Sequence, residues 1–356
     1  MSNCLTIKKW IEATNAIEYS SIKKTAIKMK TLFNSVNNLL YLLGILLLFF
    51  LSNCEDSPDC SPSEIILDNL TIDNYPKVDG STSAHPLQVL IACKLLGVEF
   101  NWMPGWFDET YRIGPSFDEK PEIARFILDS IINHGTHSAY TNLINGKADV
   151  IIVARSASDD EVKFADSMGV KLTTIPIALD AFVFIVNINN PVNSLTIKEI
   201  QDIYTGNITF WNEVGGTNTE INPYQRNPNS GSQELMLSLV MKDLTIMNFP
   251  EMILPGMMGP INRITHDKNG LGYTVYFFEQ FMAPNDSLKI LAINGIAPEY
   301  NTLINGEYTY TSNVYVVIRE DLDRLSYAYQ LHRWLLTYKG QSVIKESGYI
   351  PYYYWF

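Results

Sequence analysis

The sequence predicts a mixed α/β protein with mainly parallel sheets. Short runs rich in β-branched residues alternate along the chain with segments of helical periodicity, the pattern produced when helices pack on a sheet. The chain has 356 residues, of which 46% are hydrophobic and 12% aromatic. That composition is sufficient for two domains of ordinary size, each with its own core.

The first segment of the chain has the layout of an export signal. Residues 39–51 (LLYLLGILLLFFL) form an apolar run that follows several Lys residues. As a helix this run would cover only about 20 Å of a hydrocarbon core roughly 30 Å thick. It ends in Leu51-Ser52-Asn53-Cys54, which resembles a bacterial lipobox. We therefore expect a signal peptide at residues 1–53, with Met29 as an alternative translation start, and lipidation of Cys54.

Two other interpretations of this segment stay open. The apolar run could remain as an uncleaved membrane anchor, or it could be a buried core helix, although the polar stretch that follows it argues against burial. Residues 54–74 are rich in Ser, Pro and Asp, as expected of a tether, and the folded part is predicted to begin near Tyr75. Either form of anchoring places the folded part outside the cytoplasmic membrane.

The charge balance argues against a nucleic-acid partner. The chain carries 26 Lys and Arg against 38 Asp and Glu, and residues 1–53 account for six Lys and two Glu. The remaining chain therefore holds 20 basic and 36 acidic residues, a formal charge of −16. A surface of that charge repels a phosphate backbone.

The predicted strands are short segments rich in Val, Ile and aromatic residues. They cover residues 148–154, 173–177, 181–187, 271–276 and 314–319.

The predicted helices combine apolar periodicity with start and stop signals. Pro86 and Pro121 stand at first helical positions, Gly97 and Gly169 follow helix ends, and Ser158 opens a capping box with Glu161. The predicted helices are residues 86–96, 121–133, 158–168, 197–204, 231–242 and 325–338.

Four segments share a design in which a cluster of Gly or small hydroxyl residues marks a helix start: residues 80–83, 135–138, 155–158 and 230–232. The first amides of a helix have no partner within it, and their dipoles add, so such helix starts bind anions. Each cluster alone is also an ordinary helix cap. The last cluster is more specific, because Arg226 stands four residues before Ser230-Gly231-Ser232 and adds a guanidinium to oriented donors.

Several longer motifs resemble the phosphate-binding proteins of ABC importers, which are type II periplasmic binding proteins. The resemblance covers about residues 75–351 and is carried by five segments: 203–216 (IYTGNITFWNEVGG) together with Arg226 and Ser230-Gly-Ser232, 78–83 (VDGSTS), 148–155 (ADVIIVAR), 269–273 (NGLGY) and 348–351 (GYIP).

The resemblance implies a two-lobe α/β fold with the ligand in the cleft between the lobes. Lobe I would comprise residues 75–180 and 313–356, and lobe II residues 181–312, with crossings near 177–180 and 308–313. Matching the motifs residue by residue gives a ligand-binding set of Ser81, Thr82, Ser83, Ser138, Arg226, Ser230, Gly231 and Ser232. Thr136 could take the place of Ser138.

Two features of the predicted site leave alternatives open. Arg155 could add a second cation to the site or form an inter-element salt bridge. Ala154 stands where well-known phosphate binders have an Asp that accepts the proton of hydrogen phosphate. Asp79 or Asp180 could replace that acceptor. The identity of the ligand therefore stays open among phosphate, tungstate, molybdate and sulfate.

Other functional classes find less support in the sequence. His85, His134 and His137 lack the companion ligands that a zinc site needs, so no metal is predicted. No Gly-x-Ser-x-Gly motif or evident Ser-His-carboxylate set occurs, so we predict neither an enzyme nor a cofactor. Trp102, Trp106 and Trp211 could stack on a sugar but more often pack between lobes.

The sequence thus predicts a monomeric, lipid-anchored, extracytoplasmic protein that binds phosphate or a similar oxyanion. It would deliver this ligand to an ABC permease in the membrane. The alternatives are a sensory or adhesive surface lipoprotein with the same fold, and an enzyme acting on a phosphorylated substrate, for which we find no base or metal.

Overall fold

The computed structural model describes residue 67 and residues 69–105 and 110–353. The predicted signal peptide, Cys54 and most of the predicted tether lie outside the described residues, as does Trp106. The described residues belong to one compact unit. Among the described residues, no helix is long and apolar enough to cross a membrane.

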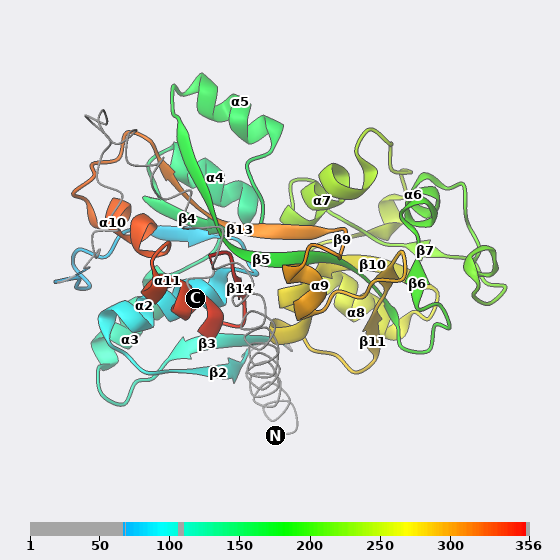
Figure 1. Cartoon of the computed structure of the whole chain (residues 1–356), viewed down its shortest axis with the longest axis horizontal. Helices are drawn as coiled ribbons and strands as arrows, with labels where there is room; N and C mark the ends of the chain where they lie inside the picture. The colour runs from blue at the N-terminus through cyan, green and yellow to red at the C-terminus, as the bar shows by residue number, and fades with distance from the viewer. Residues whose placement is uncertain (1–66, 68, 106–109, 354–356) are drawn as a thin grey trace, which may run out of the picture. The chain divides into compact units, whose positions relative to one another are not determined.

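An eight-stranded sheet, in the order β1-β4-β13-β5-β10-β7, organises the described chain, and β11 and β14 add to β5 (Figure 1). The prediction of mainly parallel strands is wrong for this sheet. Only its outer pairs, β1 with β4 and β10 with β7, are parallel, whereas β13 and β5 run antiparallel to their neighbours. The strands are β1 Val78–Gly80, β4 Val150–Val153, β5 Leu172–Asn187, β7 Asn222–Pro223, β10 Gly270–Val275, β11 Leu288–Ile290, β13 Thr311–Arg319 and β14 Ile350–Pro351.

Strand β5 is continuous where the sequence analysis predicted two separate strands. Its first part, residues 172–181, pairs with β13, and its second part pairs with β10 and β11. In Figure 1, β5 and β13 run together through the middle of the described unit. The predicted lobe boundaries fall where β5 changes partner, and they remain a prediction.

Three two-stranded sheets complete the strand structure of the described chain. An antiparallel hairpin joins β2 Phe100–Pro104 to β3 Tyr111–Pro115. The other two pairs are parallel: β6 Ser194–Leu195 with β12 Ala292–Ile293, and β8 Gln225–Arg226 with β9 Ile253–Leu254. The last pair fixes the position of Arg226, opposite Leu254.

Most predicted helices form, with changed ends. The predicted helix 231–242 is a short α-helix that continues as a π-helix, and 325–338 is divided because Thr337 caps a new helix by accepting from the amide of Gly340. The helices are α2 His85–Leu96, α3 Pro121–Ser130, α4 Thr136–Ile144, α5 Asp159–Ser167, α6 Ile197–Thr205, η2 Trp211–Val214, α7 Gly231–Leu235, η3 Met236–Met241, η4 Pro250–Met252, α8 Met258–His266, η5 Phe278–Met282, α9 Tyr300–Ile304, α10 Tyr327–Trp334 and α11 Tyr338–Glu346.

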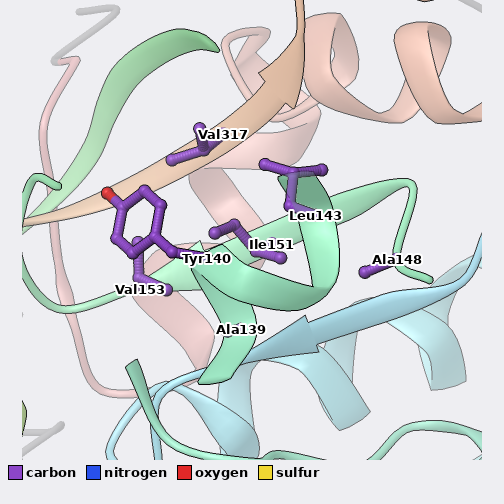
Figure 2. Close-up of a cluster of buried hydrophobic side chains, with 7 residues drawn as sticks. All are labelled: Ala139, Tyr140, Leu143, Ala148, Ile151, Val153 and Val317. Atoms are coloured by element: carbon purple, nitrogen blue, oxygen red, sulfur yellow. The ribbon is translucent and has the colours of Figure 1, made fainter. Parts of the chain in front are cut away.

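A buried cluster fixes α4 against the sheet, as Figure 2 shows. Each aliphatic side chain buried in this way contributes about 1.5–3 kcal/mol. The Tyr140 hydroxyl also donates to the carbonyl of Arg155 at 3.1 Å, which ties α4 to the end of β4. The start of α4 is therefore rigidly placed. The cluster consists of Ala139, Tyr140, Leu143, Ala148, Ile151, Val153 and Val317.

Candidate anion-binding site

The starts of α2, α4 and α7 face one pocket of about 350 Å³. The structure brings together eight of the nine residues predicted to bind the ligand, although they come from segments far apart in the chain. The eight that line the pocket are Ser81, Thr82, Ser83, Ser138, Arg226, Ser230, Gly231 and Ser232.

The loop between β1 and α2 presents unused donors. Ser81 is 4% exposed, and its Oγ atom has no hydrogen-bond partner among the described residues. Its amide donates to the carbonyl of Ile152 at 3.1 Å, which holds the loop against β4. Within the described chain, the amides of Thr82 and Ser83 have no backbone acceptor. A buried hydroxyl without a partner is costly, so a ligand that accepts from Ser81 would recover that cost.

Gly80 permits the close approach of this loop to the sheet, and we expect Gly80→Ala to disturb it. An added Cβ would lie 1.9 Å from Nε2 of Gln88 and 2.0 Å from the carbonyl oxygen of Ile152. Overpacking of this kind costs about 1–3 kcal/mol. Urea unfolding and phosphate titration should show both lower stability and weaker binding. Adding Gln88→Ala should not restore either property, because the backbone carbonyl stays in place; full recovery would show that only the Gln88 side chain was displaced.

The start of α4 contributes Ser138 from its first turn. Gly135, with φ of 83°, precedes the helix in a conformation that disfavours side chains. A Cβ built on Gly231 of α7 would lie 2.7 Å from Oγ1 of Thr136, so the starts of α4 and α7 approach closely. The amide of Ser138 has no acceptor within the described residues. Thr136 also lines the pocket, so its alternative assignment stays open.

Arg226 is the cation of this pocket. It is 5% exposed, and its backbone amide donates to Oε1 of Gln233 at 3.1 Å and to the Tyr273 hydroxyl at 3.0 Å. Its Nε donates to the carbonyl of Leu254 at 3.1 Å, while Nη1 has only the weak acceptor Sδ of Met257 at 3.3 Å. In the part of the chain that the structure describes, no carboxylate lies within salt-bridge distance of Arg226.

Burial of the Arg226 guanidinium lowers its pKa from the ordinary value, because removal from water disfavours the charged form. Buried charges in proteins are normally paired. An anion in the pocket would supply the missing partner.

The start of α7 completes the donor set. The Ser230 hydroxyl caps the helix by accepting from the amide of Gln233 at 3.2 Å, which leaves its own proton free to donate. Asn229 adopts a left-handed conformation with φ of 63°, and this turns the chain into the helix. The amides of Gly231 and Ser232 have no acceptor within the described chain. The helix continues directly into η3, so its dipole adds to these amides.

The structure corrects the assignment of Arg155, the ninth predicted residue, to the ligand-binding set. It does not line the pocket, because its guanidinium forms a bidentate pair with Glu161: Nη1 to Oε2 and Nη2 to Oε1, both at 2.7 Å. Arg155 and Glu161 are 5% and 1% exposed. The cause is the capping box of α5, which turns Glu161 back toward Ser158 and so toward Arg155. Of the two alternatives given for Arg155, the structure therefore shows the inter-element salt bridge.

Neither proposed substitute for the missing Asp serves as the acceptor. Ala154 lines the pocket, as predicted from its place in the motif. Both carboxylate oxygens of Asp79 already accept hydrogen bonds from protein groups, and Asp180 does not line the pocket.

The structure also brings residues to the pocket that the sequence analysis did not assign to ligand binding. Met257 contacts both Arg226 and Ser232 through its thioether, and nothing in the local sequence distinguishes it from other Met residues. His134 and His137 line the same pocket. The sequence analysis considered these two His only as metal ligands, although their position beside a helix start was a usable signal.

The described chain thus combines a mixed sheet whose central strand changes partner with a donor-lined pocket around a buried Arg. A family model described as a PBP superfamily domain matches residues 120–330. The chain therefore belongs to the PBP superfamily, and the predicted two-lobe type II fold is confirmed.

Its relatives include phosphate-binding proteins named PstS. The Borreliella burgdorferi protein is 26% identical over 258 residues, which cover 67% of this chain and 88% of the relative. The Staphylococcus epidermidis protein is 26% identical over 223 residues, covering 61% and 67% respectively.

Solved structures of the same fold include a protein described as a phosphate ABC transporter substrate-binding protein, from Clostridium perfringens, with bound phosphate. It aligns with a TM-score of 0.57 at 21% identity, covering 78% of this chain and 98% of that one. A phosphate transport receptor of ABC type from Vibrio cholerae aligns with a TM-score of 0.55 at 20% identity, covering 78% and 99%. At these identities the likeness shows the fold.

Proposed function

We propose that this protein captures phosphate, or a similar oxyanion, outside the cytoplasmic membrane and delivers it to an ABC-type importer. The observation that carries the proposal is the buried Arg226 guanidinium, which has no carboxylate partner in the described chain and faces a pocket rich in free donors. The names of the relatives, PstS and phosphate transport receptor, support phosphate as the first ligand to test.

Binding and release follow from the two-sided construction of the site. The proposed lobe I supplies Ser81, Thr82, Ser83 and Ser138, and the proposed lobe II supplies Arg226 and the start of α7. A ligand that contacts both sides favours the closed arrangement by its differential affinity for it. The closed form then docks on the permease. No covalent step is needed, so the protein acts as a carrier and not as an enzyme.

The available hydrogen bonds are sufficient for useful affinity. A hydrogen bond to a charged group contributes about 1.5–3 kcal/mol net. Five to eight such bonds offset closure and desolvation and still leave the roughly −8 kcal/mol of a micromolar complex. The ligand stays non-covalently bound and exchangeable, as delivery to a permease requires.

The location of the protein is part of the same proposal. Residues 1–53 act as the export signal, and Cys54 carries the lipid that holds a monomeric binding domain at the membrane surface. Mass spectrometry of the purified protein would identify the first residue and its modification. An unmodified chain that keeps residues 1–53 would contradict lipidation.

Calorimetry with the full chain in mild detergent tests the function itself. After bound anion has been stripped by unfolding and refolding, phosphate should bind with a stoichiometry near one per chain. At about 100 times its Kd, phosphate should stabilise the protein by roughly 2.7 kcal/mol. Sulfate, molybdate and tungstate titrated in parallel identify the preferred anion. Absence of binding by all four anions would refute the proposal.

A further inference from the structure

We propose that His134 and His137 are the hydrogen-bond acceptors that recognise a protonated oxyanion in this pocket. This inference rests on the proposed function. Arg226 and the helix amides can only donate, the Ser and Thr hydroxyls can donate or accept, and Ala154 has no polar side chain. Hydrogen phosphate carries a proton that needs an acceptor, whereas sulfate does not. The two imidazoles would supply the hydrogen-bond acceptor that Ala154 does not provide.

His134 is held by a buried carboxylate that accepts four hydrogen bonds. Asp79 is 4% exposed. Its Oδ1 accepts from the amides of Gly80 at 2.7 Å and His134 at 3.0 Å, and its Oδ2 accepts from Nδ2 of Asn142 at 2.7 Å. Nδ1 of His134 lies 2.9 Å from Oδ2. Three of these four contacts come from groups that only donate, so the carboxyl is ionised and Nδ1 carries the proton.

His137 is held in the same way by a second carboxylate. Nδ1 of His137 lies 3.0 Å from Oε1 of Glu161, whose two oxygens also accept from Arg155. The Ser158 amide donates to Oε2 of Glu161 at 2.9 Å. The guanidinium keeps Glu161 ionised, so Nδ1 of His137 also carries its proton. Asp160, a further charged group near this ring, has Oδ2 3.7 Å from the same nitrogen.

These contacts fix the tautomer of both rings. A neutral imidazole with its proton on Nδ1 has a lone pair on Nε2, which makes that atom an acceptor. In the described part of the chain, neither Nε2 has a hydrogen-bond partner. The side chains of His134 and His137 are 49% and 36% exposed, whereas those of Asp79 and Glu161 are 5% and 1% exposed. Each ring is therefore held by a buried carboxylate, and both residues line the pocket.

The arrangement predicts a ligand class and a mechanism of selectivity. Tetrahedral oxyanions that keep a proton near neutral pH, phosphate and arsenate, can donate to Nε2. Fully deprotonated anions such as sulfate, molybdate and tungstate would place an oxygen lone pair against a nitrogen lone pair, which disfavours them. The same ring nitrogens would then distinguish the two classes without a carboxylate in the pocket.

The test measures phosphate and sulfate affinity of the full chain by calorimetry. In the double variant His134→Asn, His137→Asn, the Asn amide can still donate to the carboxylate from near the Nδ1 position, but the shorter side chain has no acceptor at the position of Nε2. Phosphate affinity should fall about 10- to 100-fold, while sulfate affinity should not fall and should rise to the extent that the ring nitrogens repel sulfate in the wild type. Adding Ala154→Asp should restore the preference for phosphate. The control His266→Asn, at the end of α8 and outside the pocket, should change neither affinity.

Each other outcome has a definite meaning. If the wild-type protein binds none of phosphate, sulfate, molybdate and tungstate, the proposed function fails and this inference fails with it. If it binds only the anions without a proton, this inference alone is overturned. If the wild-type protein binds phosphate but the double variant keeps the same ratio of phosphate to sulfate affinity, only the inference is overturned. Equal weakening of both anions also overturns it, because the rings would then only position the pocket. If circular dichroism shows that the double variant is unfolded, the two single variants decide by the same ratio.

Discussion

Arg226→Ala is expected to abolish measurable phosphate binding while the protein stays folded. Among the described residues that line the pocket, Arg226 is the only Arg or Lys. The substitution removes two or more charge-assisted hydrogen bonds to the anion, each contributing about 1.5–3 kcal/mol. The expected loss is therefore about 10²- to 10⁴-fold in affinity.

The fold should survive this substitution because no buried carboxylate depends on Arg226. Its backbone contacts with Gln233 and Tyr273 do not involve the side chain, and only the carbonyl of Leu254 and the thioether of Met257 lose a donor. Calorimetry and urea unfolding on the same samples separate affinity from stability. Arg263→Ala is the matched control, because Arg263 lies on α8, outside the pocket, and donates to the Tyr224 hydroxyl. Undiminished phosphate binding by Arg226→Ala would refute the site.

The candidate site was largely predictable because its components are local. A helix start that exposes amides is determined by a few consecutive residues, such as Ser230-Gly231-Ser232. The order of the motifs along the chain then assigned four such segments to one family pattern. Arg155 was harder to assign. Its neighbour Glu161 was recognised as part of a capping box, but a carboxylate can accept from an amide and from a guanidinium at once, and only the folded geometry shows that it does.

Strand direction and strand length depend on distant segments, and here the sequence analysis failed. Alternating strand and helix patterns suggested parallel pairing, yet β13 and β5 are antiparallel and pair along residues 172–181 and 311–319. The position of Asp180 made β5 look like two strands. In the structure, Oδ1 of Asp180 accepts from the amides of Ala181 and Phe277, so the polar residue is accommodated without breaking the strand.

Asp180 itself is predicted to make the stability of the protein depend on pH. Burial raises its pKa from the ordinary 3.8 to about 7, against the opposing effect of the two amides that donate to it. The Oδ2 atom is buried without a partner among the described residues. Because the folded state holds this proton more tightly than the unfolded state, stability falls as pH rises from about 4 to about 7. The loss from this one group is roughly 4 kcal/mol.

Asp180→Asn should remove this dependence. The Asn side-chain oxygen can accept from the same two amides, and its NH₂ group lies where the proton of the neutral acid would be, opposite Ser312 on β13, whose Oγ also lacks a partner in the described chain. The variant should match the wild type near pH 4 and exceed it by roughly 4 kcal/mol at pH 8, measured by urea unfolding of the anion-free protein. Burial also raises the pKa of Glu279 to about 7, but this group is present in both proteins and cancels in the comparison.

Asp267→Asn provides a control of opposite sign. Burial favours the neutral form of Asp267, but hydrogen bonds from Tyr224 and Asn222 outweigh it and lower its pKa. The ionised form is therefore the one that the fold stabilises, and the variant should lose stability relative to wild type as pH rises through the acid range. If the difference between Asp180→Asn and wild type were the same at pH 5 and pH 8, Asp180 would titrate normally. Strand β5 would then hold no neutral carboxylic acid at the point where it changes its pairing partner.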